Sequence, residues 1–406
     1  MKEQDIFSST QIIIFNPIMK ESIDTRIEYF RYLKKMIRLV NGNRRKYTKA
    51  QIKFYKDKLC EGQEKKNIRN AQKAVLKSKF LYLLPFDLTL MLALVLQNED
   101  MHKIACILNK IVSDFHLAKK DEQILNVEFC AALGDEKAWE ELMCSKKLKG
   151  YTKYLEQVKI NTFFIKKKPY SILITATMSS GKSTLINALV GKNISLMQNM
   201  ACTSKIHTII SKPFEDGITS EHDHDMSIDA TREELLSDNE NNKSSKITVG
   251  TYFNGFLGGE RIILYDSPGV NSSENIEHME ITQRMIKARK YRLMLYVLNA
   301  TQLGTTDEEQ HLEMVAKQIG RTKVLFVLNK IDHLISEDDD IPDVIYRQQK
   351  FLASKGFDNP IVCPVSARAA YLAKKSQQEI LSRIEQREFD DYIYPKIPLN
   401  YTQVIR

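Results

Sequence analysis

The most constraining stretch of this sequence is a short apolar run that leads through a loop of small residues into a helical segment. The run covers residues 170–176, the loop ends in Gly181-Lys182-Ser183-Thr184, and residues 185–189 read Leu-Ile-Asn-Ala-Leu. A strand, a GKS/T loop and a helix in succession form a P-loop, whose backbone amides and helix N-terminus make an anion cradle. The stretch therefore predicts a phosphate-binding site on an α/β fold.

Each residue type of this loop has a chemical reason. Gly181 lets the backbone come close to a phosphate, Lys182 can reach the β- and γ-phosphates, and the Ser183 hydroxyl can ligate Mg²⁺. Ala176 replaces the usual first glycine, which is a mild departure because a methyl group is small. We expect the nucleotide-binding loop to comprise Thr177, Met178, Ser179, Ser180, Gly181, Lys182, Ser183 and Thr184.

Strand-like and helical runs alternate from residue 166 to about residue 370. The strands are expected at 170–176, 205–211, 261–266, 292–299, 323–328 and 361–365. The helices are expected near 182–191, 276–290, 306–319 and 342–355. This alternation predicts a mostly parallel sheet with helices on both faces. Residues 213–247 interrupt it as a long polar insertion, which we interpret as a mobile surface excursion.

A second motif selects the base. The buried run 323–328 ends in Asn329-Lys330-Ile331-Asp332, the NKxD pattern. A carboxylate at Asp332 can accept from both N1–H and the exocyclic amine of guanine, and adenine offers no such pair of donors. Asn329 and Lys330 would brace this loop against the base and the P-loop. The motif predicts GTP or GDP as the nucleotide.

Two further motifs follow other strands. Asp266-Ser267-Pro268-Gly269 is a DxxG pattern, in which Asp266 would hold Mg²⁺ through water and the Gly269 amide would sense the γ-phosphate. Ser366 and Ala367 resemble the backbone loop that contacts guanine O6. Any one of these motifs alone could be a strand cap or a turn. Their order on successive strands favours a nucleotide site.

The first 165 residues differ from the rest in composition and in the spacing of apolar residues. Glycine and proline are sparse there, and apolar residues recur at helical spacing, as in Ile27, Phe30, Leu33 and Ile37. We expect an all-helical domain at 1–165, a GTPase domain at 166–370 and a short helical tail at 371–406, with one helix at about 370–390. The six cysteines form no CxxC pair and no signal peptide is evident, which fits the cytoplasm.

The charge is concentrated in the helical part. Residues 1–169 carry 33 lysines and arginines against 20 acids, a balance of +13, whereas the remainder has a balance of −4. Such a surface can bind an anionic membrane or nucleic acid, and it can also be a solvated helical face with no polyanion partner. The apolar run 81–97 is interrupted by Pro85 and Asp87, so we favour a buried helix over a membrane-inserting hairpin.

The four motifs resemble those of the translation-factor-like GTPases, and within them the dynamin-like family. The more specific likeness lies in residues 178–189 and in Met200-Ala201-Cys202-Thr203-Ser204, and it covers about residues 170–370. The resemblance implies that Thr203 is the switch threonine, which ligates Mg²⁺ and orients the attacking water. It also implies that Ser179 acts with a bound K⁺ or Na⁺ in place of an arginine finger, so the catalytic set becomes Lys182, Thr203 and Ser179.

Two positions depart from related patterns. Val270 stands where Ras-like proteins place a water-orienting glutamine, and Met178 stands where eukaryotic dynamins carry a glutamine. We therefore expect slow intrinsic turnover that rises when two GTPase domains pair as a homodimer. Fewer than 40 residues follow Ala367, although the family normally has a long stalk there, so either the helices lie upstream instead or the chain is a fragment.

Three functional hypotheses follow. The first is a dynamin-like GTPase in the cytoplasm, peripheral to a membrane, whose helices self-associate or bind lipid. The second is a regulatory GTPase acting on RNA or a ribosomal particle, with the basic helices as the RNA arm, and nucleic acid is the less favoured partner. The third is a scaffold that binds GTP but scarcely hydrolyses it.

Overall fold

The structure, a computed structural model, describes most of the chain. The described residues are 16–41, 45–62, 87, 101–114, 117–146, 152–195, 205–223, 225–235, 246–269, 276–334 and 340–393. Two compact units are present. The first comprises Met1–Lys168 and Glu215–Ala230, and the second comprises Pro169–Phe214 and Thr231–Arg406.

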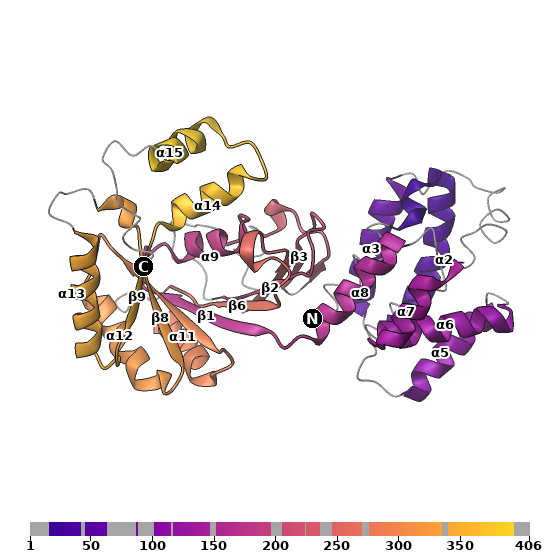
Figure 1. Cartoon of the computed structure of the whole chain (residues 1–406), viewed down its shortest axis with the longest axis horizontal. Helices are drawn as coiled ribbons and strands as arrows, with labels where there is room; N and C mark the ends of the chain where they lie inside the picture. Colours follow the sequence, from indigo (N-terminus) through magenta and orange to yellow (C-terminus); the bar gives the residue numbers. More distant parts are fainter. Residues whose placement is uncertain are drawn as a thin grey trace. The chain divides into compact units, whose positions relative to one another are not determined.

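The first unit is helical apart from two short strands (Figure 1). Its elements are η1 (Pro17–Lys20), α2 (Ile23–Asn41), α3 (Arg45–Cys60), α5 (Met101–Asp114), α6 (Lys119–Ala132), α7 (Glu136–Cys144), α8 (Thr152–Lys166), β3 (Ser220–His222) and β4 (Met226–Ser227). The apolar stripe of α2 is buried as its spacing predicts, since Ile27, Phe30, Leu33 and Ile37 are at most 1% exposed. Trp139, the one tryptophan of the sequence, is fully buried in the same core.

A buried carboxylate lies within this helical core. Asp87 accepts hydrogen bonds from the Tyr29 hydroxyl, from the Tyr154 hydroxyl at 2.8 Å and from the Asn16 amide at 3.0 Å. Burial raises the pKa of Asp87 to about 7 although these three donors act in the opposite direction. Burial, with the charge of Asp87, also raises the pKa of Glu128 well above its usual value. The other residues of the run 81–97 lie outside the described residues.

Part of the segment expected as a mobile polar insertion forms regular structure among its described residues. β3 and β4 lie in this segment and pair antiparallel, and the stretch Glu215–Ala230 that contains them belongs to the helical unit. Ile218 and Ile228 are 5% and 3% exposed in its hydrophobic core. These two isoleucines therefore tie a segment rich in polar residues to the core of the helical unit. Within the described residues, no helix is both long and apolar enough to cross a bilayer.

The second unit is built on a sheet in which six of the seven described strands match the sequence-based expectation closely, the exception being Lys246–Thr251. They are β1 (Tyr170–Ala176), β2 (Ile206–Ser211), β5 (Lys246–Thr251), β6 (Ile262–Asp266), β7 (Leu293–Asn299), β8 (Lys323–Asn329) and β9 (Ile361–Val365). Within this unit the described strands lie in the order β5-β2-β6-β1-β7-β8-β9. All pairs from β6 through β9 are parallel, and β2 runs antiparallel to β6. The mostly parallel α/β fold is confirmed.

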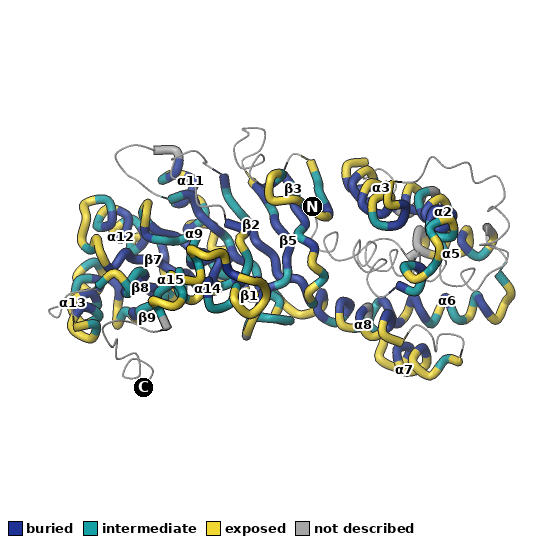
Figure 2. The backbone as a smooth tube through the Cα atoms, turned by 90° about the horizontal axis from the view of Figure 1, so that it is seen from above, coloured by how far each residue is buried: buried dark blue, intermediate teal, exposed yellow. Residues whose placement is uncertain are grey.

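Helices cover both faces of this sheet (Figure 1). One face carries α11 (Ile276–Ala288), α12 (Thr306–Ile319) and α13 (Ile341–Ser354), and the other carries α9 (Lys182–Val190) and α14 (Ala367–Ser376). Leu173, Tyr296 and Phe326 on the central strands pack against the first group. The tube view shows these central strands as largely buried (Figure 2). Their continuous apolar sequences are typical of a sheet covered on both faces.

The tail has two helices rather than the single helix expected at 370–390. α14 ends at Ser376, and α15 (Arg383–Ile393) begins after a break. The Ser382 hydroxyl accepts from the Glu385 amide at 3.3 Å, and the Ser382 amide donates to the Glu385 carboxylate at 3.1 Å. This capping box starts a new helix where the sequence pattern suggested continuity.

Candidate functional site

The parallel register brings the four sequence motifs to one edge of the sheet. Asp266 at the end of β6 pairs with Ile174 of β1, Asn299 of β7 pairs with Asn329 of β8, and Asn329 pairs with Val365 of β9. The loops after these strands therefore leave from the same edge. In open parallel sheets the carboxyl ends of the strands are where ligands bind.

The loop between β1 and α9 has the geometry of an anion cradle. Ser179 and Gly181 both have positive φ, at +59° and +85°, a backbone conformation typical of loops whose amides form anion-binding concavities. Gly181 caps the N-terminus of α9, so the positive end of that helix faces the loop. The Ser180 hydroxyl is buried and has no hydrogen-bond partner among the described residues. A polar group buried in this way is suited to a polar ligand.

Lys182 and Asp266 are in direct contact. The Lys182 ammonium donates to Asp266 Oδ1, and both side chains are nearly buried, at 12% and 9% exposed. Lys182 opens α9 and Asp266 closes β6, so the contact joins the first and third motifs. Ser183 and Thr184 follow in the first turn of α9. The oxygen donors Asp266 and Ser183 are of the hard type that Mg²⁺ prefers.

The loop after Asp266 is held from α11. The Thr282 hydroxyl donates to the Pro268 carbonyl at 3.3 Å, and His278 Nδ1 lies 3.2 Å from the Gly269 carbonyl oxygen. Gly269 also lies beside Met178 of the P-loop, because a Cβ at Gly269 would meet the Met178 Cγ at 3.4 Å. The P-loop and the DxxG loop are therefore neighbours.

Asn329 joins three loops. Its Nδ2 donates to the Ser180 carbonyl at 2.9 Å, and its Oδ1 accepts from the Ala367 amide at 3.0 Å. Next to it, Lys330 adopts a left-handed conformation at φ +65° and its ammonium donates to the Ser179 carbonyl at 2.7 Å. The NKxD loop is thus fastened to both the P-loop and the loop that holds Ser366 and Ala367.

Asp332 lies close by, in the short helix η5 (Ile331–His333). Its side chain is 6% exposed, and Oδ2 lies 3.4 Å from His333 Nε2. Tyr392 of α15 donates to the same oxygen at 3.3 Å. Ser366 is the N-cap of α14, where its hydroxyl accepts from the Ala369 amide at 3.2 Å. The structure thus gives the Ser366 side chain a local capping partner.

Sequence reasoning did not single out Asn299. It ends β7, and its Nδ2 lies 3.5 Å from the Ser179 carbonyl and 3.3 Å from Gln302 Oε1. The sequence pattern could have identified Asn299, because it is the polar residue at the carboxyl end of an apolar strand, as Asn329 is on β8.

A buried polar chain beneath the site was also missed. The Ser267 hydroxyl donates to Thr175 Oγ1 at 3.1 Å, Thr175 lies 3.5 Å from His311 Nε2, and the Tyr296 hydroxyl lies 3.0 Å from His311 Nδ1. Burial lowers the pKa of His311 to about 4, so the ring is neutral at pH 7. The chain connects Ser267, the residue after Asp266, with β1, α12 and β7. Its members are scattered in the sequence, so no local pattern revealed it.

Not every expected site residue can be placed. Thr203, expected as the switch threonine, lies outside the described residues, as do Val270 and the rest of the segment 196–204. Of the other members of the expected set, Thr177 directly follows β1, and Lys182, Ser183 and Thr184 form the start of α9. The rest lie in the loops or at the strand ends described above.

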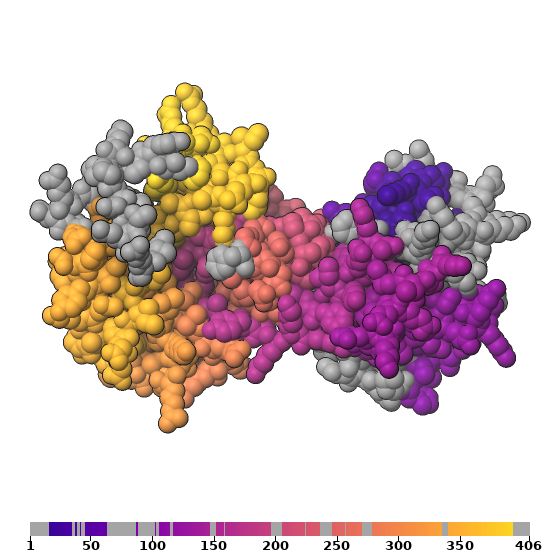
Figure 3. Space-filling model, viewed as in Figure 1, coloured from indigo at the N-terminus to yellow at the C-terminus, as the bar shows by residue number. Residues whose placement is uncertain are grey.

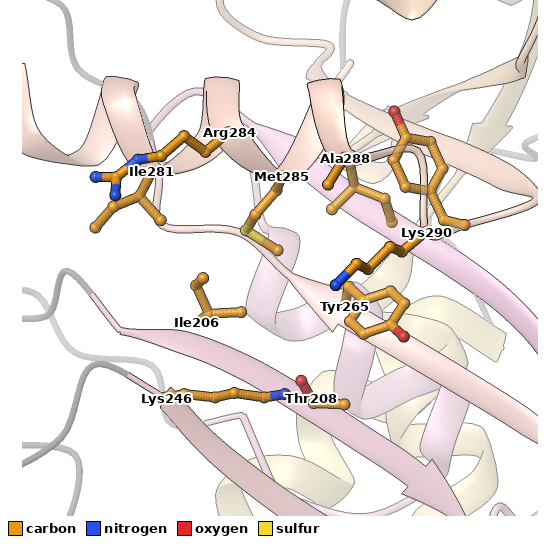
Figure 4. Close-up of a pocket in the computed structure, with 11 residues that line it drawn as sticks. Ile206, Thr208, Lys246, Tyr265, Ile281, Arg284, Met285, Ala288 and Lys290 are labelled. Atoms are coloured by element: carbon orange, nitrogen blue, oxygen red, sulfur yellow. The ribbon is translucent and has the colours of Figure 1, made fainter.

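A separate cavity of about 470 Å³ lies between α11 and strands β2, β5 and β6 (Figure 4). Its apolar lining includes Ile206, Tyr265 and Met285, with Arg284 and Lys290 also present. The four motifs contribute no residue to it. It is therefore distinct from the strand-end edge where the motif loops meet.

A parallel sheet that carries a GKS loop, a DxxG loop and an NKxD loop at one edge defines a P-loop GTPase domain. Residues 172–331 match the model of the Dynamin family. This segment is therefore a GTPase domain of the dynamin-like type. A curated relative from Caldicellulosiruptor sp. (strain Rt8B.4), called an uncharacterized protein in the xynA 3′ region, is 27% identical over 247 residues. The alignment covers 58% of this chain and 56% of the relative, so the chain spans little more than half of that protein's length.

Three solved structures are more distant. An oligomerised bacterial dynamin pair, described as sensing and tethering membranes, is 16% identical with a TM-score of 0.40, covering 92% of this chain and 57% of the other. Aquifex aeolicus Era with bound GDP and aluminium fluoride is 18% identical with a TM-score of 0.31, covering 53% and 58%. The G domain of the T. maritima FeoB iron transporter is 16% identical with a TM-score of 0.28, covering 49% and 89%.

Proposed function

We propose that this chain binds GTP with Mg²⁺ and hydrolyses it to GDP and phosphate. The observation that carries the proposal is Asn329, whose single amide group reaches the P-loop at Ser180 and the Ala367 loop. Asp332 lies three residues further on. Asn329 thus holds the loop that carries Asp332 against the P-loop and the Ala367 loop, which supports a site that binds a whole nucleotide.

In this proposal each motif has one task. Lys182 and the amides of residues 177–184 bind the phosphates, and the Gly269 amide responds to the γ-phosphate. Asp332 accepts from N1–H and the 2-amino group of guanine, and the Ser366–Ala367 loop approaches guanine O6. Ser183 and Asp266, with Thr203, would hold Mg²⁺, which supplies charge neutralisation between the β- and γ-phosphates. Lys182, now paired with Asp266, would turn to the phosphates when nucleotide binds.

To test base recognition, the Asp332 carboxylate, which only accepts hydrogen bonds, is replaced by an amide, which also donates. A side-chain amide at this position would donate to the carbonyl that xanthine carries in place of the 2-amino group, so Asp332→Asn should move the preference from GTP to XTP. Calorimetry of the parent and the variant with GTP, XTP and ATP measures this. A parent that binds GTP no better than ATP, or a variant that keeps the parental preference, would contradict the proposal.

We further propose that hydrolysis is slow in the monomer and rises when two GTPase units pair. Val270 cannot hydrogen-bond to water, so charge stabilisation has to come from elsewhere, and a monovalent cation at Ser179 is the device that the dynamin-like resemblance implies. The rate of phosphate release per molecule should rise with protein concentration. It should also be higher in K⁺ or Na⁺ than in choline. Lys182→Ala is the inactive control. A rate indifferent to both concentration and cation would exclude this mechanism.

For the helical unit we propose an anionic membrane surface as the partner. Its two segments together carry 33 lysines and arginines against 26 acids, a balance of +7, because Glu215–Ala230 adds six acids to the +13 balance of the first segment. Co-sedimentation of the full chain with vesicles containing phosphatidylserine, with and without GTP, tests it. Vesicles of neutral lipid and a structured RNA are the comparison ligands. Binding to RNA but not to anionic vesicles would favour the RNA-directed alternative.

A further inference from the structure

The last described helix, α15, is tied to both loops that would read the base. Arg368 directly follows Ala367. Its guanidinium donates two hydrogen bonds to the Glu388 carboxylate of α15, from Nε at 2.9 Å and from Nη2 at 2.7 Å. One turn further along α15, the Tyr392 hydroxyl lies 3.3 Å from Asp332 Oδ2 and 3.3 Å from Glu388 Oε1. The chain Arg368–Glu388–Tyr392–Asp332 therefore connects the loop after β9 with the loop after β8.

Two contacts outside this hydrogen-bonded chain also secure the position of α15. Lys375 of α14 donates to Glu385 at 2.7 Å, and Phe389 packs against the cluster of Ala188, Tyr371, Leu372 and Leu381. In the space-filling view α14 and α15 stand together as one mass on this unit (Figure 3). Tyr392 is thus presented to Asp332 by an anchored helix.

The shifted pKa values of Tyr392 and Glu388 favour a protonated Tyr392 that donates a hydrogen bond. Burial, with the nearby charges of Asp332 and Glu388, raises the pKa of Tyr392 well above its usual value, so the phenol keeps its proton. The Arg368 hydrogen bonds lower the pKa of Glu388, so that group is an ionised acceptor. One hydroxyl proton is therefore shared between two carboxylates at equal distance.

A carboxylate can serve Tyr392 and guanine together. Its two oxygens offer about four acceptor positions, and guanine needs only one on each oxygen. A donor already on Oδ2 limits rotation of the carboxylate, and a pre-oriented acceptor loses less entropy when a ligand binds. Because Oδ1 and Oδ2 have to meet two donors at once, a fixed plane matters more for guanine than for a base with one donor.

We infer that Tyr392 is a positioning residue for guanine recognition, which holds the Asp332 carboxylate in the plane that meets both N1–H and the 2-amino group. This inference rests on the proposed reading of guanine by Asp332. It makes α15 part of the base-selecting apparatus, although this helix carries none of the four motifs.

The experiment compares GTP with ITP, whose base lacks the 2-amino group. Tyr392→Phe removes one oxygen atom and keeps the ring. The dissociation constant for GTP should rise about fivefold, which corresponds to one hydrogen bond, whereas that for ITP should change less. The preference for GTP over ITP therefore shrinks. Tyr371→Phe, which removes a hydroxyl from the same apolar cluster, is the matched control and should leave the preference unchanged.

Glu388→Gln provides a second variant that leaves Tyr392 in place. It weakens the link to Arg368 and should lower the GTP-over-ITP preference in the same direction by a smaller factor. An unchanged preference in Tyr392→Phe overturns the inference, and so does tighter GTP binding, which would mean that the hydroxyl competes with the base. If the parent itself fails to prefer GTP over ATP, the proposed function fails instead, so the two failures are distinguishable.

Discussion

The amide nitrogen of Asn329 occupies the space that a side chain at Gly181 would need. A Cβ at Gly181 would collide with Asn329 Nδ2, and the φ of +85° at Gly181 disfavours any side chain there. Gly181→Ala should therefore displace the Asn329 amide and weaken GTP binding at least tenfold, measured with a fluorescent GTP analogue. Gly259→Ala is the control, since Gly259 has φ +75° with no neighbouring atom within 4 Å. An equal loss in both variants would contradict the steric explanation.

Asn329→Asp keeps the size of the side chain and removes its donor. The new carboxylate would face the Ser180 carbonyl, to which Nδ2 now donates at 2.9 Å. Loss of this bond and repulsion between two acceptors should cost roughly 1–3 kcal/mol, which corresponds to about 5-fold to 160-fold weaker binding of GTP. Calorimetry with GTP and GDP should show similar losses for both, because the bond braces the site and does not touch the γ-phosphate. A loss confined to GTP would contradict this.

The stability of the helical unit should fall as the pH rises from 4 to 7. The folded-state pKa of Asp87 is raised from 3.8 to about 7, so the folded protein binds more protons than the unfolded chain between these values. One such proton changes the free energy of unfolding by about 1.4 kcal/mol per pH unit. Glu128, whose pKa is also raised, acts in the same direction.

Urea unfolding followed by the fluorescence of Trp139 reports this unit alone, because no other tryptophan occurs. Asp87→Asn should flatten the pH dependence, leaving only the part due to Glu128. Asp24→Asn changes an exposed carboxylate and should keep the parental slope. Stability that increases with pH over this range would contradict the assignment.

Truncation of Ile218 or Ile228 should destabilise the helical unit although both residues lie far from its helices in sequence. Each is buried in the core that contains Trp139. Isoleucine to alanine in such a place costs about 2–4 kcal/mol, seen as a lower urea midpoint of Trp139 fluorescence. Asp229→Ala in the same segment removes only an exposed ion pair with Lys58 and should cost under about 1 kcal/mol. Equal midpoints for Ile228→Ala and the parent would refute the packing argument.

The fold of the second unit was largely readable from the sequence. Six strands were expected within one residue of their observed bounds, because buried parallel strands are continuous apolar runs that end in polar motifs. β5 was missed, since its Lys246-Ile-Thr-Val-Gly-Thr251 follows a long polar stretch and contains a glycine. The second tail helix was missed because the capping box at Ser382 was not recognised.

The contacts that complete the site were less predictable. The motifs indicated Lys182, Asp266, Asn329 and Asp332, because each follows a strand in a known pattern. The Ser267–Thr175–His311–Tyr296 chain and the Tyr392 contact join residues up to 136 positions apart, and only the folded register brings them together. Sequence spacing carries no information on such pairs.

The assignment of residues 215–230 to the helical unit means that the backbone passes from one unit to the other at 168–169, at 214–215 and again at 230–231. A gene fragment cut at Lys168 would lack Ile218 and Ile228, so it would leave an apolar surface uncovered and invite aggregation. During synthesis the helical unit likewise stays unfinished until the ribosome has passed Ala230, well into the neighbouring unit. To produce the helical unit alone, Glu215–Ala230 has to be linked to Met1–Lys168 in one polypeptide. Truncation at a single position is not enough.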